Sequence, residues 1–174
     1  MDTLRAFIAL ELPDRLRHEL SLHAERFSGL DKHYRMRWLP PENYHLTLEF
    51  LGDVNFANLY DLQYTLEQKL GSTKAVQCKI PTITPFPFSR PKITAALLER
   101  TFELLKLQTD VANCAQSYVI YPKRRRFVPH VTLGRLKPHA RKAIDFQARN
   151  ILLSVFTESV TLFQSELAPY GAIH

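Results

Sequence analysis

The sequence has little of what would assign it to a secreted or membrane-bound class. Its two cysteines, Cys78 and Cys114, lie far apart and form no Cys-x-x-Cys pair, so we expect reduced thiols in a cytoplasmic protein. No apolar run approaches the roughly 18 residues that span a bilayer. The N-terminus lacks the basic region and the small-residue cleavage site of a signal peptide. These absences predict a cytoplasmic protein without a membrane-spanning segment.

Glycine is also scarce, with five residues in the chain. There is no glycine-rich phosphate loop, no G-x-G-x-x-G and no G-x-S-x-G, which argues against nucleotide-binding and hydrolase folds built on those turns. Metal binding by His45 and His130 stays open on the residues alone. However, no cysteine, aspartate or further histidine stands beside either one at ligand spacing. We expect neither a cofactor nor a metal.

What the chain does have is the composition of a globular protein with a basic surface. Hydrophobic residues make up 45% and aromatic residues 11% of its 174 residues, enough for a substantial core. This length fits a single domain over residues 1–174, or one compact unit of two similar lobes. The net charge of +6 suggests a polyanionic partner, although many housekeeping proteins are equally basic.

Hydrophobic periodicity and turn residues predict several strands for each helix. Such an order favours an α+β fold with antiparallel sheets over a doubly wound parallel sheet. The proline-rich stretch 84–91 is expected to be a loop, and residues 171–174 to begin a partner strand. We expect strands at 4–12, 35–39, 43–53, 76–84, 93–98, 127–135 and 158–167, and helices at 13–29, 55–71, 101–115 and 138–155.

Two of these strands carry the same short motif about half a chain apart. Residues 45–48 and residues 130–133 both read His-x-Thr-Leu within an apolar, alternating run. Successive side chains of a strand point to opposite faces, so each histidine shares a face with the threonine two residues later. Each segment therefore offers an imidazole and a hydroxyl side by side, held from behind by core residues. Two such strands could face each other across a cleft.

Two imidazoles on either side of one substrate can act as general base and general acid. The unperturbed pKa of histidine, about 6.5, lets one ring be neutral and the other protonated near neutral pH. The hydroxyls of Thr47 and Thr132 could donate hydrogen bonds to the oxygens of a phosphoryl group between the rings. A structural role for both motifs is also open, since a histidine on a strand is often a core residue and β-branched threonine is common in strands.

Three further features could belong to the same site. Arg135 could bind phosphate, but strict alternation places it on the face opposite His130 unless Gly134 forms a bulge or the strand ends. Phe127 could stack on a base or ribose, and the basic run 123–126 could attract RNA phosphates. Each has a plain alternative: Arg135 could pair with an acid, Phe127 could belong to the core, and the basic run could be a solvated loop.

With both motifs in place, the chain resembles the two-histidine (2H) phosphoesterase superfamily. It looks most like the bacterial and archaeal RNA 2′,3′-cyclic phosphodiesterases, historically named 2′-5′ RNA ligases. The resemblance spans almost the whole chain. It rests on the stretches 4–9, 45–52, 86–92 and 127–135.

The resemblance implies an α+β, bilobal fold of pseudo-twofold symmetry, with two antiparallel sheets lining a central cleft and helices outside. It implies metal-independent hydrolysis of RNA 2′,3′-cyclic phosphate ends to 2′-phosphate ends, with weak reverse 2′-5′ ligation, by a monomer. By position, His45 would be the general acid and His130 the general base. Thr47, Thr132 and Arg135 would hold the phosphate.

Two other functions stay open. The chain could be a phosphodiesterase of small cyclic nucleotides or of ADP-ribose cyclic phosphate, although the basic run favours RNA. It could also be a non-catalytic RNA-binding module that keeps the fold, although the intact His and Thr of both motifs favour an enzyme.

Overall fold

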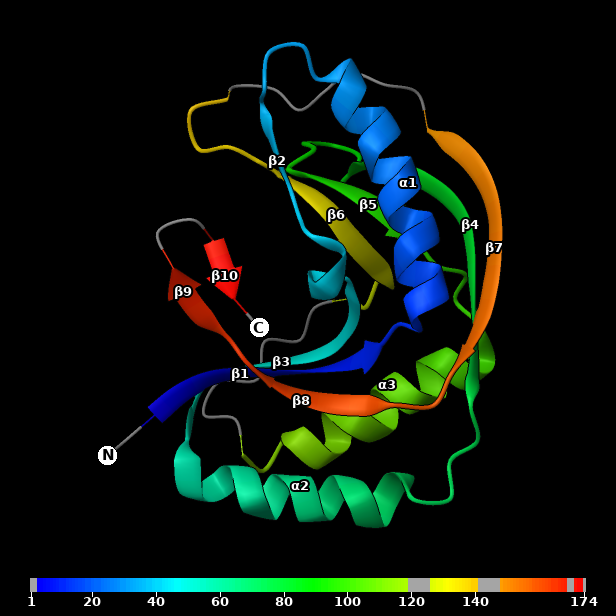
Figure 1. Cartoon of the computed structure of the whole chain (residues 1–174). Coiled ribbons are helices and arrows are strands. Elements are labelled where there is room, and N and C mark those ends of the chain that lie inside the picture. Colours follow the sequence, from blue (N-terminus) through cyan, green and yellow to red (C-terminus); the bar gives the residue numbers. More distant parts are fainter. Residues whose placement is uncertain (1–2, 119–125, 141–147, 169–170, 174) are drawn as a thin grey trace.

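A computed structural model describes residues 3–118, 126–140, 148–168 and 171–173 (Figure 1). Within these ranges the strands are β1 (Thr3–Glu11), β2 (Met36–Trp38), β3 (His45–Asn55), β4 (Val76–Phe86), β5 (Ile93–Leu97), β6 (His130–Leu136), β7 (Arg149–Thr157), β8 (Val160–Gln164), β9 (Glu166–Ala168) and β10 (Gly171–Ile173). The helices are α1 (Asp14–Leu30), α2 (Phe56–Leu70), α3 (Phe102–Ala115) and the short 3-10 helix η1 (Pro41–Asn43).

The main sheet contains eight strands, and every pair in it is antiparallel. Its order is β7-β4-β5-β6-β3-β1-β8, with β2 added on β6, while β9 and β10 pair with each other as a separate hairpin. The expected α+β fold with antiparallel pairing is confirmed. The two sheets implied by the resemblance are halves of one continuous sheet, joined where β3 meets β6.

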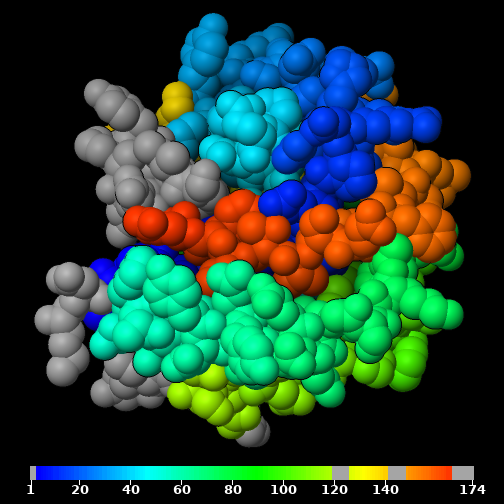
Figure 2. Space-filling view, turned by 60° about the horizontal axis from the view of Figure 1, so that its bottom comes forward, coloured from blue at the N-terminus to red at the C-terminus, as the bar shows by residue number. Residues whose placement is uncertain are grey.

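The sheet curls until its two edge strands meet. β7 and β8 lie at opposite ends of the strand order, yet the chain passes from one to the other through Glu158 and Ser159 alone. Figure 2 shows this passage as one orange band. The Glu11 amide donates to the Ser159 carbonyl over 3.0 Å, and Thr157 Oγ1 donates to the Glu11 carbonyl over 2.6 Å. These bonds fix the curl that makes the inner side of the sheet concave.

The helices cover the other side of the sheet with apolar stripes at helical spacing. Polar caps start two of them: Asn55 Oδ1 accepts from the Ala57 amide, and Thr101 Oγ1 from the Leu104 amide. The buried residues of the three helices are Leu16, Leu20, Ala24 and Phe27 of α1, Leu62 and Leu66 of α2, and Leu104, Leu107, Val111 and Ala115 of α3.

One expected element is wrong, and another is longer than expected. Of the helix expected at 138–155, residues 141–147 lie outside the described ranges, and from Arg149 the chain forms β7. There Ile151, Leu153 and Val155 alternate with exposed residues, and the strand pairs with β4. The apolar residues of this stretch fit both a helical spacing and the alternation of a strand, and pairing with β4 favoured the strand. β4 continues through Pro85 to Phe86, so the proline-rich loop starts later. The expected start of a strand near residue 171 is confirmed as β10.

Two expectations from the missing residue types can also be compared with the structure. In the part of the chain that is described, no helix is long and apolar enough to cross a membrane. Cys78 and Cys114 are both free thiols, and Cys78 is buried.

Candidate active site

The two motifs open two neighbouring antiparallel strands. β3 begins at His45 and β6 at His130, and Leu46 and Val131 are register partners, both with 0% exposure. The residues that flank this pair follow the same antiparallel register, so His45 lies opposite Thr132 and Thr47 lies opposite His130. Directly opposite side chains share a face. All four motif side chains therefore lie together on the concave face, called the inner face below, while Leu46 and Val131 lie in the core.

The leucine of each motif makes a bulge at the same place. On β3, the partners of Ile8 and Ala9 are Glu49 and Thr47, so Leu48 is the extra residue. On β6, the partners of Thr94 and Ala95 are Gly134 and Thr132, so Leu133 is the extra residue. Both leucines are buried. A bulge bends its strand and increases its twist, which explains why both motifs end in leucine and why the sheet curls at the site.

The second bulge carries Arg135 to the inner face. Arg135 is opposite Ile93 on β5, and Ile93 shares a face with Ala95 and Leu97, the partners of Thr132 and His130. The register shift at Leu133 therefore reverses the strict alternation that would have turned Arg135 away. A bulge is present, but its extra residue is Leu133 and not Gly134, which lies at its end under the indole of Trp38.

Each threonine faces an alanine on the next strand. Ala9 is opposite Thr47, and Ala95 is opposite Thr132, both with 0% exposure. A residue without a longer side chain leaves room on the inner face for the histidine rings. The two halves of the site thus repeat a His, a Thr, a bulged Leu and a facing Ala, as the pseudo-twofold expectation requires.

The environment of His130 suits a general base. Its Nδ1 lies 2.8 Å from the Val128 carbonyl, which can only accept, so Nδ1 carries the proton and Nε2 offers its lone pair. Phe86 packs against the ring with 5.2 Å between centroids. Burial, opposed by the Val128 hydrogen bond and supported by the charge of Arg135, lowers the pKa of His130. The neutral imidazole is therefore favoured near neutral pH.

His45 packs against two phenylalanine rings from its own half of the sheet. Its ring centroid is 4.8 Å from that of Phe7 on β1 and 5.7 Å from that of Phe163 on β8. Phe7 and Phe163 are register partners and stack on each other with centroids 5.1 Å apart. Both histidines are thus flanked by phenylalanine from other strands of the same half of the sheet, which restricts their ring orientation.

Not every residue singled out in the sequence reaches this cluster. Phe127 is half-buried and packs against the hydrophobic core, which agrees with its plain alternative. Of the basic run, residues 123–125 lie outside the described residues, and Arg126 is exposed. The sequence interpretation did not bring Phe7, Phe86 or Phe163 to the histidines, because contacts between strands follow from register and curl and not from local spacing.

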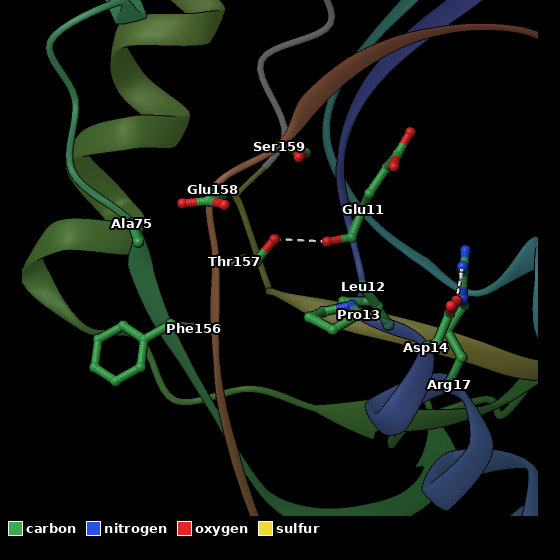
Figure 3. Close-up of a pocket in the computed structure, with 10 residues that line it drawn as sticks. All are labelled: Glu11, Leu12, Pro13, Asp14, Arg17, Ala75, Phe156, Thr157, Glu158 and Ser159. Atoms are coloured by element: carbon green, nitrogen blue, oxygen red, sulfur yellow. Dashed lines mark hydrogen bonds and ion pairs between the residues drawn. The ribbon is translucent and has the colours of Figure 1, made fainter.

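A pocket lies elsewhere, at the corner where β7 passes into β8 (Figure 3). The hydrogen bond from Thr157 to the Glu11 carbonyl crosses it, and the ion pair of Asp14 and Arg17 lies at its side. No residue of either motif lines it, so it is a structural corner of the curled sheet. Its lining is formed by Glu11, Leu12, Pro13, Asp14, Arg17, Ala75, Phe156, Thr157, Glu158 and Ser159.

The described ranges contain no group of side chains suited to bind a metal ion. There, no three residues among histidine, cysteine, aspartate and glutamate are grouped as ligands of one ion would be.

A curled antiparallel sheet with two His-x-Thr pairs on its concave side agrees with the arrangement that the resemblance to the two-histidine phosphoesterases implies. The family model described as LigT like Phosphoesterase matches residues 10–92. The RNA 2′,3′-cyclic phosphodiesterase of Aquifex aeolicus is 28% identical over 188 residues, covering 100% of this chain and 95% of the relative. The chain is similar to the LigT-like phosphoesterases, as its motifs indicated.

Solved structures show the same fold. The protein TT0787 of Thermus thermophilus aligns with a TM-score of 0.79 at 24% identity, covering 98% of this chain and 93% of that one. LigT of E. coli, in complex with 3′-AMP, aligns with a TM-score of 0.80 at 21% identity, covering 99% and 94%.

Proposed function

We propose that this chain hydrolyses the 2′,3′-cyclic phosphate at the end of an RNA strand and leaves a 2′-phosphate. The observation that carries the proposal is the placement of two histidines and two threonines on one concave face around the Leu46–Val131 pair. The names of the relatives support RNA as the substrate class, because curated members similar to almost the full chain are RNA 2′,3′-cyclic phosphodiesterases.

His130 acts as the general base in this proposal. The neutral ring, with Nε2 unprotonated, takes a proton from a water molecule as the water oxygen bonds to phosphorus. Its lowered pKa keeps this form populated near neutral pH. The hydrogen bond from Nδ1 to the Val128 carbonyl stabilises the imidazolium that forms, because the carbonyl oxygen faces the positive ring.

His45 acts as the general acid at the other side of the phosphoryl group. Its proton passes to the ribose O3′ as the P–O3′ bond breaks, so the phosphate stays on O2′. The hydroxyls of Thr47 and Thr132 donate to the non-bridging oxygens, and Arg135 holds the same phosphate. These steps use only side chains of the chain. With the 5′-hydroxyl of a second RNA in place of water as the nucleophile, the same steps give a 2′-5′ linkage.

The test is incubation with a short RNA that ends in a 2′,3′-cyclic phosphate, in excess EDTA, with identification of the product. A terminal 2′-phosphate, absent with His45→Ala and His130→Ala, supports the proposal. A 3′-phosphate would reverse the leaving oxygen and the assignment of acid and base. Binding of the RNA by the folded protein without turnover would contradict an enzymatic function.

A further inference from the structure

Arg37 is a second arginine on the inner face, next to Arg135. The two residues are register partners on the antiparallel strands β2 and β6, so their side chains share a face. The side chains of the two residues that flank Arg37 face the opposite side of the sheet. Met36 is buried, and Trp38 packs on Gly134 and on the hydrophobic core. The inner face at β2 is thus occupied by Arg37.

The two arginines lie at different distances from His130. The positive charge of Arg135 is among the causes that lower the pKa of His130, and the positive charge of Arg37 is among those that lower the pKa of Arg135. Arg135 lies on β6, the strand of His130, whereas Arg37 lies on the neighbouring strand β2. Arg37 is therefore one strand farther from His130 than Arg135 is.

Further cations border the same end of the sheet. The Lys137 amide donates to the Arg35 carbonyl over 2.8 Å, and the Leu136 amide donates to the Lys92 carbonyl over 2.7 Å. Arg35, Lys92 and Lys137 therefore lie at the ends of three adjacent strands, β2, β5 and β6. A strand advances about 7 Å for every two residues, a spacing suited to successive phosphates of an extended nucleic-acid strand. Strand alternation puts Arg35 and Lys137 on the inner face with Arg37 and Arg135, and Lys92 on the opposite face. The inner face is therefore basic at this end of the sheet, away from the motif residues.

We propose that Arg37 binds the phosphodiester that joins the terminal nucleotide to its 5′ neighbour, while Arg135 holds the cyclic phosphate. This inference rests on the proposed function and adds the substrate class: the site takes the end of a chain with at least one internal phosphodiester in preference to a mononucleotide. Guanidinium suits this role because its fork pairs with two phosphate oxygens at once. The contact is to the backbone, so it selects for a chain and not for a base.

The experiment compares two substrates with the same terminal base: a nucleoside 2′,3′-cyclic phosphate and a dinucleotide that ends in a 2′,3′-cyclic phosphate. Values of kcat/KM are measured for the wild type, Arg37→Gln, Arg37→Lys and the control Arg15→Gln. Arg15 carries the same charge on the exposed surface of α1, where it pairs with Glu19.

We expect the wild type to prefer the dinucleotide. Arg37→Gln should reduce that preference by about 10- to 100-fold, the size of one lost charge-assisted contact, mainly through KM. Arg37→Lys keeps the charge without the fork and should retain part of the preference. Arg15→Gln should retain all of it. The slope of log(kcat/KM) against log salt for the dinucleotide should become less steep by about 0.7 in Arg37→Gln, as for one lost phosphate contact on a single strand.

Two results would overturn the inference and leave the proposed function standing. One is a wild type that turns over both substrates with equal kcat/KM. The other is an Arg37→Gln variant whose preference is unchanged, or whose losses on the two substrates are equal. A folded wild type that turns over neither substrate would instead reject the proposed function itself, so the two failures are distinguishable.

Discussion

Leu46 of β3 and Val131 of β6 are register partners in the core, and they join the two halves of the sheet directly beneath the motif residues. Because each lies between the His and the Thr of its motif, the packing of these two side chains sets the separation of the two histidines. We therefore expect stability and activity to depend on the same contact.

Leu46→Ala should lower the free energy of unfolding by about 2–5 kcal/mol, the cost of a cavity at a fully buried leucine. It should also lower kcat per folded molecule, since the two strands shift against each other. Leu104→Ala on α3 is the matched control, with the same deletion at 0% exposure outside the site. Denaturant unfolding and active-site-normalised kinetics measure both effects. Equal activity per folded molecule in the two variants would contradict the proposed role of the Leu46–Val131 contact.

His45→Ala and His130→Ala should each reduce kcat by at least ~10²-fold, as is usual for a lost general acid or base. The double variant should lose much less than the product of the two single losses, because the groups act in one concerted step. Single-turnover rates on a cyclic-phosphate RNA measure this. A near wild-type rate in either single variant would disprove the two-histidine assignment.

Thr47→Val and Thr132→Val remove a hydroxyl and keep the branched shape that suits a strand. Each should reduce kcat/KM by about 10- to 100-fold through one lost hydrogen bond to a charged phosphate, with the free energy of unfolding almost unchanged. Thermal unfolding of the same samples is the control. If both variants keep the full rate, the threonines are strand residues without a catalytic role.

The pH dependence of kcat/KM should be bell-shaped, with its acid limb below the ordinary histidine value of about 6.5. The direction follows from the lowered pKa of His130: the base is active when neutral, so a lower pKa extends activity to lower pH. Arg135→Gln removes a charge that disfavours the imidazolium. The acid limb should then move to higher pH, whereas Arg15→Gln should leave it in place. An acid limb that moves to lower pH in Arg135→Gln would contradict the assignment.

Gly134→Ala tests the end of the second bulge. A Cβ at this position would lie 3.0 Å from Cε3 of Trp38, so the strand or the indole must shift. We expect a loss of roughly 1–3 kcal/mol in stability and a reduced phosphate affinity as Arg135 moves. Gly29→Ala, in α1 with nothing within 4 Å of the new Cβ, should be neutral or slightly stabilising. Similar losses at both glycines would reject the packing argument.

Much of the fold could be predicted because its signals are local. Asn55 and Thr101 cap α2 and α3, as expected of a polar residue that precedes an amphipathic helix. The alternation of apolar and polar residues predicted β1, β4 and β5 close to their observed bounds. The helix expected at 138–155 was wrong from Arg149 onward because Ile151 and Val155 fit both the helical and the strand period. Only the pairing of β7 with β4 decided between helix and strand.

The sequence by itself determined the chemistry of this protein: two His-x-Thr-Leu segments, each with its histidine and threonine on one face of a strand, follow from the period of two along a strand. Only the tertiary structure decided how those faces meet. The register of Leu46 with Val131, the bulges at Leu48 and Leu133, and the partnership of Arg37 with Arg135 all depend on residues distant in the chain. A hydrogen-bond register between two strands is a property of the pair, and neither strand encodes it alone.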